Sequence, residues 1–88
     1  MRMYTEEELD FAKVDGVGSI AMVRRVRTLD PYDIWYVVDQ VELYGDYRKR
    51  TTRTYTELAD AIYDYQKRLA IMEAKRGVKW LTTNNDAK

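Results

Sequence analysis

Arginine, lysine and tyrosine recur through the middle of this 88-residue chain, and these are the residue types whose spacing could support chemistry. Guanidinium and ammonium groups bind phosphates, whereas tyrosine rings stack on nucleic-acid bases. Tyrosine and arginine are also enriched at the hot spots of protein interfaces. The candidate partner-binding residues are Arg25, Arg27, Tyr36, Tyr44, Tyr47, Lys49 and Arg53. They predict a binding surface for a protein or a nucleic acid.

Catalytic and metal-binding constellations are not found in the sequence. The chain has no histidine and no cysteine, which excludes Ser-His and Cys-His catalysis and ordinary zinc sites. Carboxylate-only chemistry or a carboxylate Mg²⁺ site is the alternative, but turns and ion pairs account for Asp30, Asp33 and Asp39. The four glycines are scattered and form no phosphate loop. We therefore predict no enzymatic activity, no cofactor and no metal.

Composition limits the compartment and the partners. The absence of cysteine fits a reducing environment, and no apolar run approaches the ~20 residues of a membrane span. The start of the chain is acidic, where a signal peptide would be basic and then apolar. Fifteen acidic residues balance fifteen basic ones, so no overall field attracts nucleic acid. These features predict a cytoplasmic protein with no membrane partner.

Residues 54–76 are predicted to form one long amphipathic helix. Thr54 and Glu57 have the spacing of a capping box, and Gly77 supplies a stop. At about 100° per residue, one apolar stripe comprises Leu58, Ile62, Tyr65, Leu69 and Met72. Such a stripe needs a platform, which the preceding strands must provide. A thinner second strip consists of Ala59, Tyr63, Ala70, Ile71 and Ala74. It would be covered by the N-terminal helix through Leu9 and Phe11, by the tail residues Val78, Trp80 and Leu81, or by another copy of the chain, so a homodimer through the helix is a further hypothesis.

The remaining elements are three strands and a short N-terminal helix. Strands are predicted at 17–28, 34–44 and 47–53, and a capping box at Thr5 and Glu8 indicates a helix at 6–13. The fold class is therefore α+β: a three-stranded antiparallel meander packed against one long C-terminal helix. Residues 1–81 form a single domain, and 82–88 form a flexible tail.

The register of the first hairpin follows from a predicted type I turn at 30–33, which pairs Leu29 with Ile34. This pairing places Arg24 opposite Asp39. It also places under the helix Ile20, Met22, Val26, Trp35, Val37, Val41 and Leu43, and it leaves the partner-binding residues together on the other face. In the second hairpin, Tyr44 pairs with Tyr47, while a bulge at Gly45 would exchange its faces.

Three resemblances bear on function. The predicted order of helix, three strands and helix is similar to that of double-stranded-RNA-binding domains, but the basic KKxAK run of that family is replaced at 57–61 by the acidic ELADA. Arg48-Lys49-Arg50 running on to Glu57-Leu58-Ala59 resembles the DNA-binding arm domains of phage integrases. A small chain with short strands, many tyrosines and no catalytic residues also resembles phage accessory proteins that block host enzymes, including anti-CRISPR proteins. No family is identified.

We therefore expect a non-enzymatic protein-interaction module. A small phage or mobile-element protein that binds a host protein or complex in the host cytoplasm, and inhibits or modulates that machine, fits this description. The alternative is a nucleic-acid-binding domain that uses a basic, tyrosine-rich sheet face.

Overall fold

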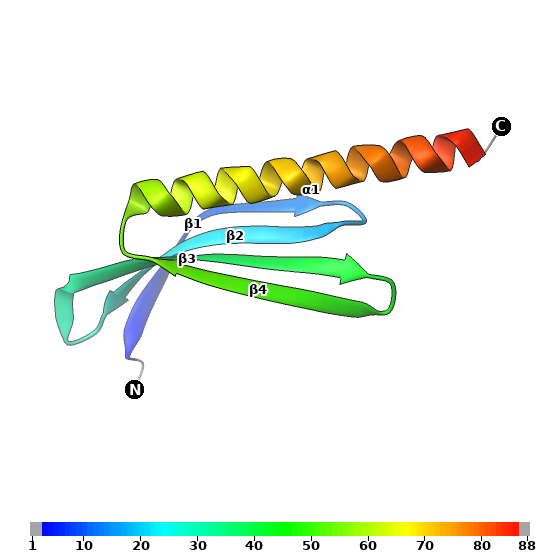
Figure 1. The fold of residues 1–88 in the computed structure, drawn as a ribbon. Helices are drawn as coiled ribbons and strands as arrows, with labels where there is room; N and C mark the ends of the chain where they lie inside the picture. Colours follow the sequence, from blue (N-terminus) through cyan, green and yellow to red (C-terminus); the bar gives the residue numbers. More distant parts are fainter. Residues whose placement is uncertain (1–2, 87–88) are drawn as a thin grey trace.

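The computed structural model describes residues 3–86, with side chains to residue 77. Its elements are β1 (Tyr4–Val14), β2 (Gly18–Arg27), β3 (Asp30–Tyr44), β4 (Tyr47–Tyr55) and α1 (Leu58–Asp86). The strands form one antiparallel sheet in the order β1-β2-β3-β4. The helix lies along one face of this sheet and continues past the ends of the strands (Figure 1). The α+β class and the single C-terminal helix are confirmed, but the sheet has four strands instead of three.

The predicted N-terminal helix at 6–13 is wrong, because these residues belong to strand β1. Glu6 lies opposite Arg25 and Glu7 lies opposite Arg24 on β2. The Arg25 Nε donates a hydrogen bond to the Glu6 carboxylate at 2.8 Å. The acidic run that indicated a helix start therefore serves to pair with an arginine-rich strand, an interaction that local helix signals do not include. A register shift between Glu8 and Asp10 forms a bulge in β1.

The predicted register of the first hairpin is also wrong. The turn lies at residues 28–29, Arg27 pairs with Asp30, and the next pair is Val26 with Ile34. Residues 31–33 form the irregularity on β3, where Pro31 lacks the N–H that a regular ladder would use. As a result Ile20 lies opposite Gln40, not opposite Leu43.

This change of register reverses the faces of β3. Val38 packs in the core beneath α1, whereas Val37 belongs to the opposite face. Trp35, which was expected under the helix, lies on that opposite face, half-buried and edge-to-face against Tyr4 with ring centroids 5.7 Å apart. Arg24 pairs with Tyr36 instead of Asp39. We call the sheet face away from α1 the open face.

The second hairpin has the predicted register. Tyr44 lies opposite Tyr47 and Glu42 opposite Lys49, as expected for a two-residue loop at residues 45–46. Gly45 has φ +59, a conformation that glycine adopts without strain. The side chains of β4 therefore share faces with those of β3 as predicted. Relative to β2, however, the side chains of both strands lie on the opposite face from the one predicted.

The core lies between α1 and the first three strands. Its buried members are Val14, Val17, Ile20, Met22, Val38, Ala61, Tyr65 and Met72. Four residues of the predicted helix stripe pack here, Ile62, Tyr65, Leu69 and Met72, while Leu58 is 40% exposed. The helix thus packs mainly on the two central strands, β2 and β3, and less on the edge strands β1 and β4.

The predicted end of the helix at Gly77 is wrong, because α1 passes through this residue without a positive φ. The helix continues to Asp86, so it includes most of the segment expected as a flexible tail; residues 87–88 lie outside the described part of the chain. Among the described residues, no helix combines the length and apolar character that crossing a membrane requires.

Candidate functional site

The partner-binding residues predicted from the sequence lie on two faces. Arg25 and Arg27 belong to β2, and Arg25 pairs with Trp35 on the open face. The other five share the helix side of β3 and β4: Tyr36, Tyr44, Tyr47, Lys49 and Arg53. The structure therefore brings together five of the predicted residues and separates the two arginines of β2 from them.

Arg25 and Arg27 both form ion pairs with carboxylates of the same chain. The Arg25 Nε lies 2.8 Å from Glu6, and its guanidinium lies 4.5 Å from the centroid of the Tyr4 ring. The Arg27 Nε lies 2.6 Å from Asp33. Because both cations have an anionic partner on the same face, they offer little unneutralised charge to a ligand.

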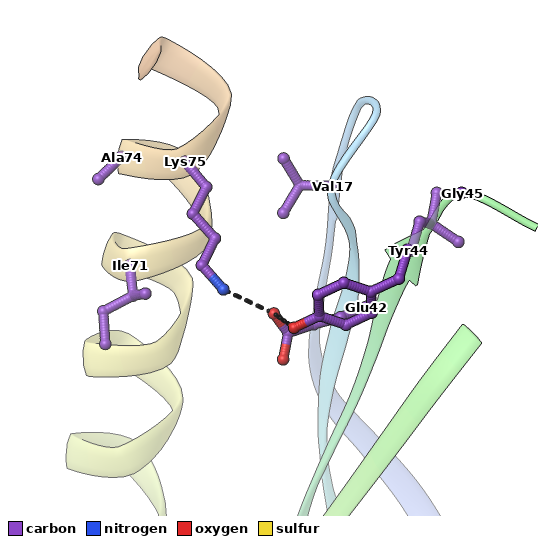
Figure 2. A pocket seen from close by; sticks show the side chains of 8 residues that line it. Val17, Glu42, Tyr44, Gly45, Ile71, Ala74 and Lys75 are labelled. Carbon is purple, nitrogen blue, oxygen red and sulfur yellow. Dashed lines mark hydrogen bonds and ion pairs between the residues drawn. The ribbon is translucent and has the colours of Figure 1, made fainter. Parts of the chain in front are cut away.

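The helix side contains a groove between α1 and the β3–β4 hairpin, which we call the helix groove. Its apolar half has a volume of about 640 Å³ and is lined mainly by Val17, Leu43, Tyr44, Ile71 and Ala74. Figure 2 shows Ile71, Ala74 and Lys75 on the helix and Val17 and Tyr44 on the sheet side, with Lys75 reaching across to Glu42. This volume lies within the range of about 300–1,000 Å³ typical of ligand pockets.

An ion pair separates the apolar half from the remainder of the helix groove. The Lys75 Nζ donates to a Glu42 carboxylate oxygen at 2.8 Å, and the Tyr44 hydroxyl donates to the same oxygen at 3.1 Å (Figure 2). The hydrogen bond from Lys75 lowers the pKa of Glu42, and the Glu42 carboxylate raises the pKa of both Lys75 and Tyr44. These contacts hold the C-terminal part of α1 to β3.

The second half of the helix groove is cationic. It has a volume of about 320 Å³ and is lined by Gln40, Glu42, Arg53, Asp64, Lys67, Arg68, Ile71 and Lys75. Four basic side chains therefore face two carboxylates. Arg53 and Lys67 form no ion pair among the described residues, so their charge is available to an incoming group.

A part-buried polar network forms the floor of the cationic half. The Arg68 Nε donates to both oxygens of Asp64 at 2.9 and 3.0 Å, and its Nη1 donates to the Gln40 Oε1 at 2.6 Å. Gln40 is only 5% exposed. Burial, followed by a hydrogen bond to Asp64, raises the pKa of Tyr55 beside this network. A fixed Arg68 leaves Lys67 and Arg53 as the adaptable cations of the groove.

Two tyrosines stand at the β3–β4 turn beside the apolar half. The rings of Tyr44 and Tyr47 stack with centroids 5.6 Å apart and an interplanar angle of 21°. Tyr44 is 40% exposed and Tyr47 is 64% exposed, and Lys49 follows on the same face of β4. This pair offers an aromatic surface at the mouth of the helix groove.

Sequence reasoning missed the contribution of the helix to this site. Lys67 and Lys75 were not among the predicted partner-binding residues, because the helix was expected to cover the face of β3 that carries Trp35. The only relevant signal in the sequence was the thin apolar strip, which contains Ile71 and Ala74. Both of these residues line the apolar half.

The described residues contain no group of three or more acidic side chains arranged to hold a metal ion. Comparisons with protein-family models, with curated proteins and with solved structures give no match for this chain. Function must therefore be argued from the helix groove itself: an apolar pocket adjoining a cationic surface.

Proposed function

We propose that this protein is a non-enzymatic protein-interaction module that binds an acidic segment of a partner protein in the helix groove. The observation that carries the proposal is the division of the groove into an apolar half and a cationic half. A segment with one large apolar side chain next to acidic residues would complement both halves.

The apolar half supplies the anchor site. Ile71 is 47% exposed and Tyr44 is 40% exposed, so a side chain bound between them would remove apolar surface of both residues from water. Burial of apolar surface contributes about 25 cal/mol per Å², and interface energy concentrates in such central pockets. The anchor therefore provides most of the affinity.

The cationic half supplies selectivity. Arg53 and Lys67 come from β4 and α1 on opposite sides of the groove, and both are free to pair with carboxylates. Charge complementarity raises the association rate and suppresses partners of the wrong sign more than it adds affinity. A basic segment would be repelled at the same position.

A nucleic-acid ligand is the second candidate, and the stacked tyrosines favour it. Tyr47 presents an exposed ring beside Lys49, an arrangement suited to a base and its phosphate. The carboxylates of Glu42 and Asp64 in the groove oppose a phosphate backbone, which is why we rank this candidate second. That the partner is the host machine of a phage-encoded inhibitor stays a prediction from the sequence.

Selection from a random 12-residue peptide library on the immobilised protein tests the proposal. We expect enriched peptides that combine acidic residues with one large apolar residue. Binding of an enriched peptide should weaken at least tenfold in the Ile71→Glu variant and in the Arg53→Glu/Lys67→Glu variant. Phe11→Glu, at an exposed position of the open face, is the matched control and should bind normally.

An oligodeoxythymidine of 20 nucleotides is the second probe. Binding of this probe that falls steeply with salt and is lost in Arg53→Glu/Lys67→Glu, without peptide enrichment, would assign the groove to nucleic acid. Peptides without acidic residues, or peptides that bind all variants equally, would contradict the proposed function.

A further inference from the structure

The two edges of the sheet carry opposite charge. Strand β1 forms one edge and β4 forms the other. The outer strand β1 contains Glu6, Glu7 and Glu8 in succession, whereas β4 contains Arg48, Lys49 and Arg50. Edge strands present unpaired backbone N–H and C=O groups to any chain that can add to the sheet.

We propose that the chain associates with further copies of itself, head to tail, through pairing of β1 of one copy with β4 of the next. Like edges repel, because β1 against β1 brings together carboxylates and β4 against β4 brings together cations. Unlike edges attract. The occupant of each edge is therefore the opposite edge of a second copy of this chain.

The strand directions permit this pairing without reversing either copy. Strands β1 and β4 run in opposite directions, because three successive antiparallel pairings separate them. A second copy placed beside the first, with its helix on the same side, therefore meets it through an antiparallel junction. This is the geometry of strand addition to an existing sheet.

One antiparallel register matches all three charge pairs. If Glu7 of one copy lies opposite Lys49 of the next, Glu6 lies opposite Arg50 and Glu8 lies opposite Arg48. The faces agree as well, since Glu6 and Arg50 belong to the open face and Glu7 and Lys49 to the helix side. Opposite charges directly across strands stabilise such a pairing. Glu6 and Arg50 already pair with Arg25 and Asp39 of their own chain, so the attraction between copies comes mainly from Glu7 with Lys49 and Glu8 with Arg48.

The bulge in β1 limits the junction without preventing it. The irregularity falls between Glu8 and Asp10, so the part of β1 from Tyr4 to Glu8 keeps regular pairing with β2. This regular part contains all three glutamates. A heterologous junction of this kind leaves one free edge of each sign, so the assembly grows into a ring or a filament instead of stopping at a symmetric dimer.

Charge reversal on each edge, followed by mixing, tests the inference. The acidic edge is reversed in Glu7→Lys/Glu8→Lys, and the basic edge in Arg48→Glu/Lys49→Glu. Both choices leave intact the ion pairs of Arg25 with Glu6 and of Arg50 with Asp39, whereas Glu7→Lys removes the exposed pair of Glu7 with Arg24 at 3.9 Å. Sedimentation velocity measures the mass of each protein, starting from a monomer of 10.5 kDa, at low and high salt.

We expect the wild-type chain to show a mass that rises with concentration at low salt and falls toward the monomer at high salt. Each variant alone should associate at least tenfold more weakly, because its two edges carry the same sign. An equimolar mixture of the two variants should regain association, because each then supplies the edge that the other lacks. Recovery in the mixture also excludes misfolding of either variant.

The control is Lys67→Glu/Arg76→Glu, which changes net charge as much as the β4 variant but lies on the helix. It should associate like the wild type, because neither residue belongs to an edge strand. A wild-type monomer at every concentration and salt overturns the inference. Association that is equal in all variants, or a mixture that stays monomeric, overturns it as well. None of these outcomes bears on peptide binding in the helix groove.

Discussion

At the scale of single residues, the helix groove depends on polar side chains that are satisfied inside the fold. Gln40 is buried beneath α1, and a buried amide without a partner would destabilise the fold. Arg68 satisfies its Oε1 and is itself held by Asp64. This network holds Arg68 in place and leaves Arg53 and Lys67 without an ion pair among the described residues. The groove therefore has a fixed floor and two cations that can pair with a ligand.

The Glu42–Lys75 pair predicts a dependence of stability on pH. Lys75 lowers the pKa of Glu42 from its ordinary value of 4.5, so the stabilisation is present above that value and is lost as the pH falls through the lower pKa of the folded state. At pH 7 we expect Glu42→Gln to reduce the free energy of unfolding by about 1 kcal/mol. Urea unfolding at pH 7 and pH 3 should show a difference between variant and wild type that is largest at pH 7.

Glu73→Gln is the matched control for this prediction. Glu73 pairs with Arg76 on the exposed surface of α1, where an ion pair contributes at most about 0.5 kcal/mol. An equal loss in both variants, or a Glu42→Gln effect that persists at pH 3, would show that the charge on Glu42 does not stabilise the fold.

Gly18 is the position where a single methyl group should be most damaging. It has φ +152, and an added Cβ would lie 1.9 Å from the backbone oxygen of Val41. Backbone atoms cannot move aside as a side-chain end can, so we expect Gly18→Ala to lower the free energy of unfolding by more than about 2 kcal/mol. Gly16→Ala, at φ +77 with open space around the Cβ, should cost about 1 kcal/mol. Thermal melts of the two variants with the same midpoint would contradict this account.

At the scale of elements, local signals and long-range pairing differ in how well they predict structure. The helix and the β3–β4 hairpin were predictable because their signals lie within the element: an apolar stripe, and a two-residue loop with Gly45. Strand β1 was not predictable, because its glutamates favour a strand only through pairing with Arg24 and Arg25 of β2, which local sequence signals do not include. The β2–β3 register failed because residues 31–33 form a bulge instead of the turn, and Asp39, expected opposite Arg24, pairs with Arg50 on β4.

The same distinction explains how far the candidate site was predictable. Five of the predicted residues lie on one face of the sheet, because β3 and β4 keep their predicted register. Of these five, Tyr44 and Arg53 line the helix groove. Arg25 and Arg27 were grouped with them wrongly, because that step depended on the β2–β3 register. The helix residues of the groove could be assigned only after it was known which face α1 covers.

Substitution of Gly77 tests whether the helix ends at this residue or continues through it. As a stop it would need a left-handed conformation, and an alanine there would destabilise the protein. Within a continuous α1, with nothing within 4 Å of an added Cβ, Gly77→Ala should increase the free energy of unfolding by about 0.5–1 kcal/mol. Far-UV circular dichroism and urea unfolding measure the change. Gly45→Ala, at φ +59, is the control and should destabilise instead.

At the scale of the whole molecule, the fold is a single helix on a single sheet. The Cα atoms extend over 60 × 26 × 14 Å, so the molecule is two layers thick, and one sheet face and both sheet edges remain uncovered. Val37 is 1% exposed on the open face only because neighbouring strand side chains shield it. The accessible surface is 6642 Å², whereas a rounded domain of this mass would have about 5,400 Å². The two-layer shape therefore exposes about a fifth more surface than a rounded domain.

The shape itself is measurable. The Cα radius of gyration is 16.2 Å, whereas a rounded domain of this length would have about 12 Å. Small-angle X-ray scattering on a dilute sample in high salt, where pairing between sheet edges is screened, should give a value near the larger figure at the mass of a monomer. The reason is that α1 continues beyond the strands (Figure 1), and nothing in the described chain folds back over it. A radius near 12 Å at monomer mass would mean that the last turns of α1 do not extend beyond the strands in solution. The boundary of the helix groove at that end would then differ from the one described above. A larger radius accompanied by a larger mass at low salt would instead report copies joined through their edges.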